Sequence, residues 1–255
     1  MDYVANHFFN DGWSLDACFG RALNSGIFKR EEIVCAKTLY NYVDSGLIEI
    51  KNHHLPEKLS RKPNKKVYNV NKRKLGRSIE ERPKCINSRN EFGHLECELV
   101  LGVKTKDDNV ILTLLERMTR EHWIIPLANK DSETVLNAFM ELKTHCEEHF
   151  NEVFKTITTA NGSEFADLSN LEAVSKTLIY YTHSYTSCEN GAIERHNRLI
   201  RRFLPKGKRV DQYNVQEIFD VEIWANSLPR KILGYKTPDE LFEDELNKIY
   251  QVDAA

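Results

Sequence analysis

Apolar and polar residues alternate along the chain after Phe92, which is the pattern of a β-strand with two different faces. One face of the predicted strand carries Leu95, Cys97, Leu99 and Leu101. The other face carries Glu96, Glu98 and Val100. Four further apolar runs predict strands at 109–115, 122–127, 154–159 and 178–181.

Helical spacing marks segments between and after these strands. A helix is expected to begin at Asp131 or Ser132, and its apolar stripe is Val135, Phe139, Leu142 and Cys146. A second helix is expected within 187–209, with a buried stripe of Ile193, Ile200, Phe203 and Leu204. Strands and helices in this order are compatible with an α/β domain over 92–255.

The first 50 residues predict a small helical unit. Ser14 can cap a helix that reaches about Leu23, and a second short helix is expected over 37–43. Two helices joined by a turn suit either a plain helical hairpin or a helix-turn-helix that contacts DNA. The pattern alone leaves both interpretations open.

The composition is that of a globular protein with one larger and one smaller domain. The chain has 255 residues, of which 41% are hydrophobic, and this is enough for a packed core. No window approaches the roughly 18 apolar residues of a membrane span, and the amino terminus lacks the basic and apolar regions of a signal peptide. We therefore expect a cytoplasmic protein without a membrane partner. The six cysteines form no Cys-x-x-Cys pair, so we expect reduced thiols without disulfides or zinc.

Positive charge gathers in two stretches, although the net charge of the whole chain is only −2. Residues 51–91 hold thirteen Lys or Arg against four Glu, a net charge of +9. Residues 195–209 hold seven Lys or Arg and no acid. The first stretch is either a solvated linker or an arm that contacts DNA phosphates. The second is either a solvated helix surface or a phosphate-binding face.

The sequence from Glu194 to Gly207, with Glu-Arg-His-Asn at its start and Pro-Lys-Gly at its end, resembles the third-carboxylate helix of DDE transposases of the insertion-sequence-thirty family. Matching segments at 72–82, 92–102, 156–165 and 228–238 extend the resemblance over nearly the whole chain. The resemblance implies a ribonuclease H-like integrase catalytic core at 92–255, with DNA and further copies of the chain as partners. It also favours a helix-turn-helix-like region at 1–50 and a DNA-contacting arm at 51–91. Family members carry a further helix-turn-helix before this point, so an amino-terminal truncation is expected.

The resemblance also implies a site of three carboxylates that bind magnesium for phosphoryl transfer. The three positions hold Glu98, Ala160 and Glu194 in this chain, which leaves Glu98 and Glu194 as the expected metal ligands. The resemblance and the local charge together imply a larger set of DNA-contacting residues. This set is Lys72, Arg73, Lys74, Arg77, Arg195, Asn197, Arg198, Arg201, Arg202, Lys206, Lys208 and Arg209.

Ala160 is the main departure from the family pattern. The 33 residues between Ala160 and Glu194 are the separation expected of the family, which places Ala160 at the second aspartate. Glu98 replaces the first aspartate and carries its carboxylate one methylene farther from the backbone. Glu164 and Glu96 are nearby carboxylates, and we expect neither of them to replace the missing ligand.

Two functions from different classes follow from these residues. The first is a transposase that cuts and joins DNA at insertion-sequence ends, impaired by Ala160 and by Glu98. The second is a non-catalytic DNA-binding or partner-binding protein of transposase descent, which Ala160 favours for this chain. A ribonuclease H-like nuclease that acts on other nucleic acids is a third and more remote interpretation, because the motif at 228–238 resembles insertion-sequence transposases.

Overall fold

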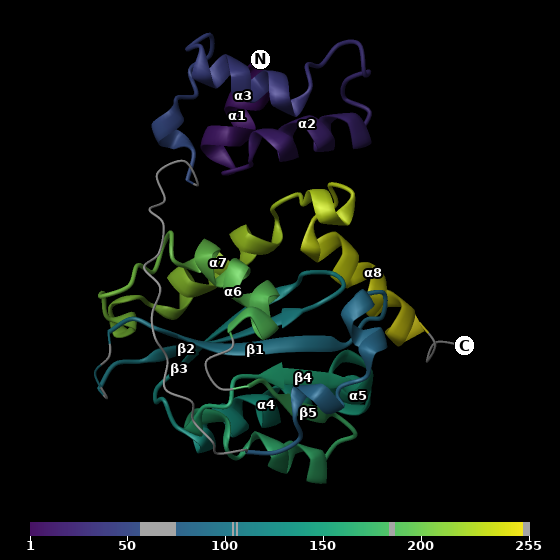
Figure 1. Ribbon diagram of the computed structural model, residues 1–255, viewed down its shortest axis with the longest axis vertical. Coiled ribbons are helices and arrows are strands. Elements are labelled where there is room, and N and C mark those ends of the chain that lie inside the picture. Colours follow the sequence, from purple (N-terminus) through teal and green to yellow (C-terminus); the bar gives the residue numbers. More distant parts are fainter. Residues whose placement is uncertain (57–74, 104, 106, 184–186, 252–255) are drawn as a thin grey trace. The chain divides into compact units, whose positions relative to one another are not determined.

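The computed structural model describes residues 1–56, 75–103, 105, 107–183 and 187–251, and the chain forms two compact units (Figure 1). The first unit contains 1–67 and 227–240, and the second contains 68–226 and 241–255. Residues 57–74, a large part of the predicted basic arm, lie outside the described residues. The domain boundaries expected at residues 50 and 91 stay predictions.

The second unit is built on a five-stranded sheet with the order β3-β2-β1-β4-β5 (Figure 1). The strands are β1 (His94–Leu101), β2 (Val110–Glu116), β3 (His122–Leu127), β4 (Thr156–Thr159) and β5 (Leu178–Tyr181). The pairs β1·β2 and β2·β3 are antiparallel, whereas β1·β4 and β4·β5 are parallel. Every strand predicted from the apolar runs is present. Three antiparallel strands continued by two parallel ones form a ribonuclease H-like α/β fold, which confirms the predicted fold class.

Helices cover both faces of this sheet (Figure 1). They are α4 (Ser132–Cys146), α5 (Phe150–Val153), α6 (Gly191–Ile200), α7 (Val215–Asn226) and α8 (Pro238–Gln251). Short 3-10 helices connect them: η2 (Ile79–Glu81), η3 (Lys84–Ser88), η4 (Glu147–His149), η5 (Ser163–Phe165), η6 (Leu168–Ala173), η7 (Ser187–Asn190) and η8 (Val210–Gln212).

The face of the sheet that carries Leu95 and Cys97 packs against α4 and α5. Asp131 caps α4, because its carboxylate accepts a hydrogen bond from the amide of Thr134 at 2.7 Å. Phe139, on the predicted apolar stripe of α4, is fully buried in this core. The predicted helix and the alternation of β1 are both confirmed.

The opposite face of the sheet packs against α6 and α7, and Val100 belongs to the apolar cluster there. Ile200 and Leu204 are buried in this cluster as predicted. Phe203 is 42% exposed, so its predicted place in the buried stripe is wrong. The reason is that α6 ends at Ile200 and the chain turns ahead of Pro205, a residue that disfavours helical backbone before it. The Phe203 ring packs edge-on against Trp224 instead, with centroids 4.8 Å apart.

The first unit contains α1 (Asp2–Asn10), α2 (Leu15–Asn24), α3 (Ala36–Asp44), η1 (Asn52–His54) and η9 (Lys231–Leu233). Ser14 caps α2, since its hydroxyl accepts a hydrogen bond from the amide of Ala17 at 3.1 Å. The sequence pattern did not predict α1. Residues 227–240 join this unit through α2, where the Arg21 guanidinium pairs with the Glu240 carboxylate at 2.9 Å. The predicted helical unit is therefore present with one more helix than expected.

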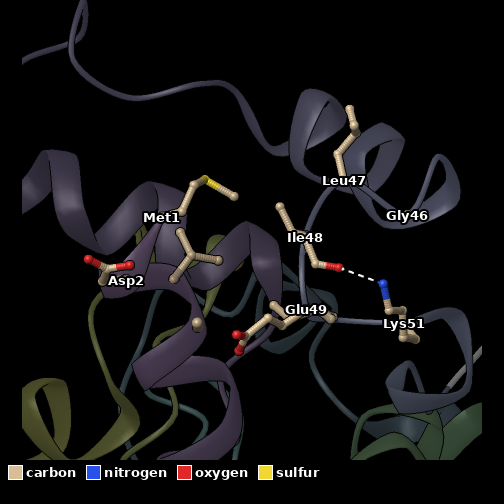
Figure 2. A pocket seen from close by; sticks show the side chains of 10 residues that line it. Met1, Asp2, Gly46, Leu47, Ile48, Glu49 and Lys51 are labelled. Carbon is tan, nitrogen blue, oxygen red and sulfur yellow. Dashed lines mark hydrogen bonds between the residues drawn. The ribbon is translucent and has the colours of Figure 1, made fainter.

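A cavity of about 620 Å³ opens in this first unit between the start of α1 and the segment after α3 (Figure 2). Its lining mixes apolar side chains such as Val4 and Ile48 with Asp2, Glu49 and Lys51. The Lys51 side chain lines the cavity and donates a hydrogen bond to the carbonyl of Ile48 at 3.0 Å (Figure 2).

The described residues show whether any helix could span a membrane and whether cysteines are paired. None of the helices in the described ranges is long and apolar enough to cross a membrane. Among the described residues, Cys18, Cys35, Cys85, Cys97 and Cys146 are free cysteines.

Candidate active site

The three positions implied by the transposase resemblance lie on β1, after β4 and on α6. β1 and β4 run parallel, with Cys97 opposite Thr159. The next residues, Glu98 and Ala160, are therefore neighbours where β4 ends. Glu194 lies in the first turn of α6, the helix that packs on the Glu98 face of the sheet.

Glu98 is half-buried, and its surroundings change its acidity. Burial raises the pKa of Glu98, the hydrogen bond from Asn197 opposes this, and repulsion from the carboxylates of Glu194 and Glu96 raises it further. The Asn197 side-chain amide donates to Glu98 Oε2 at 2.7 Å. Asn197, one turn after Glu194 on α6, therefore contacts Glu98 directly, and the Glu194 carboxylate contributes to the raised pKa of Glu98.

The side chain at position 160 is a methyl group that packs against the apolar core. The two carboxylates nearest to it in the sequence have other partners. Glu164 lies on η5 and pairs with Lys130 at 3.6 Å. Glu96 is fully buried, pairs with Arg117 at 2.9 Å and accepts a hydrogen bond from the amide of Ile193 at 2.9 Å. Neither side chain is placed to substitute for an aspartate at position 160.

These donors do not fit a pair of magnesium ions. Magnesium requires near-octahedral oxygen coordination, and a pair of ions needs a carboxylate shared between them. Across the part of the chain that the structure describes, no three His, Cys, Asp or Glu side chains form a metal-binding group. The site as it stands is a pair of acids, Glu98 and Glu194, beside Ala160.

The residues expected to contact DNA fall into distinct groups. Lys72, Arg73 and Lys74 lie outside the described residues. Arg195, Arg198, Lys206 and Lys208 are exposed and have no ion pair with any described residue. Arg202 is also exposed and lies over the Trp224 ring, 4.9 Å from its centroid. These five described cations present their charge to solvent.

Three other arginines of the expected set are held by protein groups. Arg77 pairs with Glu172 at 2.6 Å. Arg201 donates to the carbonyls of Leu101 at 2.8 Å and Leu204 at 3.2 Å. Arg209 pairs with Asp107 at 2.9 Å and with Asp211 at 2.5 Å. Their charge is already partly compensated, so their role as DNA contacts stays a prediction that the geometry does not favour.

Two polar residues near the site have contacts that the sequence did not predict. Asn197 was expected to contact DNA, and in the structure it is buried and bonded to Glu98. Arg117 was not singled out, although it is buried beside Glu96. The available signal was the position of Glu96 on the strand face that α6 covers, because a buried carboxylate requires a cation or hydrogen-bond donors.

Replacing Glu98 by glutamine is expected to stabilise the protein at neutral pH. The folded-state pKa of Glu98 lies above the unfolded value, so the folded protein binds the proton more tightly. Its ionisation therefore lowers the free energy of unfolding as the pH rises from the unfolded pKa through the folded one. Urea unfolding should show a gain for Glu98→Gln near pH 7.5 that shrinks towards about pH 4.

Glu141→Gln, which removes an exposed carboxylate on α4, is the matched control for that experiment. A gain of equal size at both pH values would attribute the effect of Glu98→Gln to packing instead of charge.

Comparisons with known proteins were made by sequence and by structure. No family model matches the chain. It is 40% identical over 207 residues to the "Probable transposase for insertion-like sequence element IS1161" of Streptococcus salivarius, a match that covers 81% of this chain and 58% of that protein. It is 33% identical over 172 residues to the transposase InsI of element IS30A of Escherichia coli, which covers 66% of this chain and 42% of the relative. The chain thus spans about half the length of the curated relatives that it matches.

A similar solved structure is the catalytic core domain of BIV integrase. The match covers 62% of this chain and 98% of that core, with 12% sequence identity and a TM-score of 0.41.

Proposed function

This chain is a homologue of insertion-sequence transposases, IS30 members among them, and from that relationship we propose that it is a DNA-binding transposase core with impaired strand cleavage. The observation that carries the proposal is the 2.7 Å hydrogen bond from Asn197 to Glu98, which joins α6, the helix of Glu194, to β1. Ala160 follows β4, the strand that pairs with β1. On this proposal, Glu98 and Glu194 are two acids of a three-carboxylate site whose third position is a methyl group.

The impairment follows from coordination chemistry. Two Mg²⁺ ions would supply the activation of an attacking hydroxyl and the stabilisation of the leaving oxygen. Ala160 offers no oxygen to such ions, and Glu96 and Glu164 pair with Arg117 and Lys130. This favours a non-catalytic DNA-binding protein over an active transposase.

DNA is the partner that the exposed charge supports. Arg195 and Arg198 lie on α6 next to Glu194, and Lys206 and Lys208 follow the same helix. Cations on one segment beside an acidic site suit a polyanion, because each phosphate neutralised releases counterions. Assembly of several copies on DNA belongs to the same proposal.

The protein is expected to bind duplex DNA with little sequence preference and with a steep dependence on salt. If about six phosphates are neutralised, the logarithm of the affinity should fall against the logarithm of the salt concentration with a slope near −5. Fluorescence anisotropy of a labelled duplex between about 50 and 200 mM NaCl measures this slope. Absence of binding at the lowest salt concentration would overturn the proposal.

The second part of the proposal is tested on supercoiled plasmid with Mg²⁺ or Mn²⁺. The protein should leave the plasmid intact. Metal-dependent nicking by the natural chain that Glu194→Gln abolishes would show that the site is active despite Ala160.

A further inference from the structure

Three arginines are buried on the side of the sheet that carries the acidic pair. Arg117 and Arg120 lie in the turn between β2 and β3 and are each 4% exposed. Arg82 follows η2, is 9% exposed, and donates to Thr158 Oγ1 on β4 at 2.8 Å. Thr158 pairs with Glu96 in the sheet. Burying a guanidinium is costly unless a counter-charge compensates it.

The protein supplies too little counter-charge for these three groups. Glu96 pairs with Arg117. Arg82 finds neutral acceptors, Thr158 and Asn87. Glu116 is buried close by, yet its oxygens accept hydrogen bonds from the amides of Gly93, Met118 and Thr119 and from the Thr119 hydroxyl. Three buried guanidinium groups thus have one carboxylate in contact.

Some of their donors are unused. The Nε atoms of Arg117, Arg120 and the half-buried Arg89 are inaccessible to solvent and have no hydrogen-bond acceptor. Within the described residues, the Arg120 guanidinium makes no hydrogen bond and no ion pair. Its Nε therefore lacks the acceptor that buried polar atoms normally have.

The electrostatics of these arginines show how close they lie. Burial lowers the pKa of Arg117 to about 10; Glu96 opposes this, and Arg82, Arg89 and Arg120 lower it further. The pKa of Arg120 is also lowered, first by burial and then by Arg89, with a smaller contribution from Arg195, while Glu96 and Glu116 oppose this. Arg195 is exposed and follows Glu194 on α6. Arg89, Arg117 and Arg120, called the arginine cluster below, therefore extend from the buried turn towards the exposed Arg195.

We infer that Arg89, Arg117 and Arg120 hold a backbone phosphate of the DNA that the acidic pair faces. The inference rests on the proposed function, since it needs a DNA ligand. Guanidinium groups match phosphate oxygens with paired N–H donors. A phosphate at the surface edge of these arginines would supply counter-charge to Arg89 and Arg120, which form no ion pair with any described residue. Arg195, which is exposed beside the cluster, would contact the next phosphate of the DNA backbone. The arginine cluster would thereby position the DNA strand relative to Glu98 and Glu194.

Arg120→Gln tests this contact, because glutamine keeps a polar side chain at a left-handed backbone position, φ 68°, and removes the charge. The expected result is a loss of duplex affinity of about 3- to 10-fold and a salt slope shallower by about 0.9, the value for one phosphate contact. Arg120→Lys should keep most of the slope. Lys143→Gln on α4, which packs on the opposite face of the sheet, removes the same charge and should leave the salt slope unchanged.

Arg89→Gln is a second test at a half-buried position, in case Arg120→Gln does not fold, and thermal melting reports folding of each variant. If the natural chain binds DNA and both folded variants match Lys143→Gln, the inference is overturned while the proposed function stands. If the natural chain does not bind DNA, the proposed function fails first. The last measurement uses inorganic phosphate as the ligand. Stabilisation by millimolar phosphate that Arg120→Gln removes, with duplex affinity unchanged, would assign the cluster to a free anion and overturn the DNA contact.

Discussion

Replacing Ala160 by aspartate is expected to raise the affinity for Mn²⁺ and Mg²⁺ above that of the natural chain. The new carboxylate would lie at the end of β4 beside Glu98 and within range of Glu194. A third oxygen ligand should raise Mn²⁺ affinity by about ten-fold or more, about 1.4 kcal/mol in binding free energy. Adding Glu98→Asp shortens that side chain by one methylene, and the double variant should nick supercoiled DNA. Isothermal titration calorimetry and the plasmid assay measure the two effects.

The folding stability of Ala160→Asp, with and without metal, is an independent test of the same site. Without metal, a third carboxylate adds repulsion to Glu98 and Glu194, so Ala160→Asp should be equally stable or slightly less stable than the natural chain. Metal should then raise its melting temperature, because only the folded site binds the ion. Ala173→Asp, at an exposed position on η6, is the matched control. No gain in metal binding at position 160 would show that Glu98 and Glu194 do not form one site.

Replacing Glu96 by glutamine is expected to destabilise the second unit by about 3 to 5 kcal/mol, because it leaves a buried arginine without its counter-charge. Glu96 and Arg117 have side chains that are 1% and 5% exposed and lie 2.9 Å apart. Glu96 also holds the amide of Ile193 at the start of α6, so the change should loosen the helix that carries Glu194. Urea unfolding followed by circular dichroism measures the loss.

The control is Glu91→Gln, which breaks an exposed pair with Lys155 at a similar distance of 2.8 Å and a longer contact with His94 at 3.3 Å. That pair should contribute less than about 1 kcal/mol, because water screens it. Equal losses for the two substitutions would mean that burial does not set the strength of the Glu96 pair.

Local patterns in the sequence predicted much of the fold. The alternation after Phe92 correctly separated the Leu95 face of β1 from the Glu98 face, since successive side chains of any strand point to opposite sides. Ser14 and Asp131 were recognised as caps, because a cap is set by its own next few residues. The prediction that Phe203 is buried was wrong. Phe203 keeps helical spacing in the sequence, but α6 ends at Ile200.

The candidate site was partly visible in the same way. The motif around Glu194 and the spacing to Ala160 predicted both positions, and their role in one site stays a prediction. The parallel pairing of β1 with β4 brings Glu98 next to Ala160 at the end of β4. In the sequence, Glu96 and Glu98 are equivalent, two acids on one face of one strand. Their different roles depend on partners far along the chain: Arg117 and the amide of Ile193 hold Glu96, whereas Asn197 donates to Glu98.

The sequence shows where charged residues are, but only the folded structure shows their partners and their exposure. The sequence located the basic stretch that begins at Arg195, but it did not separate the exposed Arg198 from Arg209, which two aspartates hold. It also gave no reason to expect that Arg117 and Arg120, in a short turn between strands, are buried beside the acidic site. Periodicity and capping depend on neighbours within a few residues, so the sequence alone predicts them. The partner of a charge, and whether water reaches it, depend on segments that meet only when the sheet and its helices pack together.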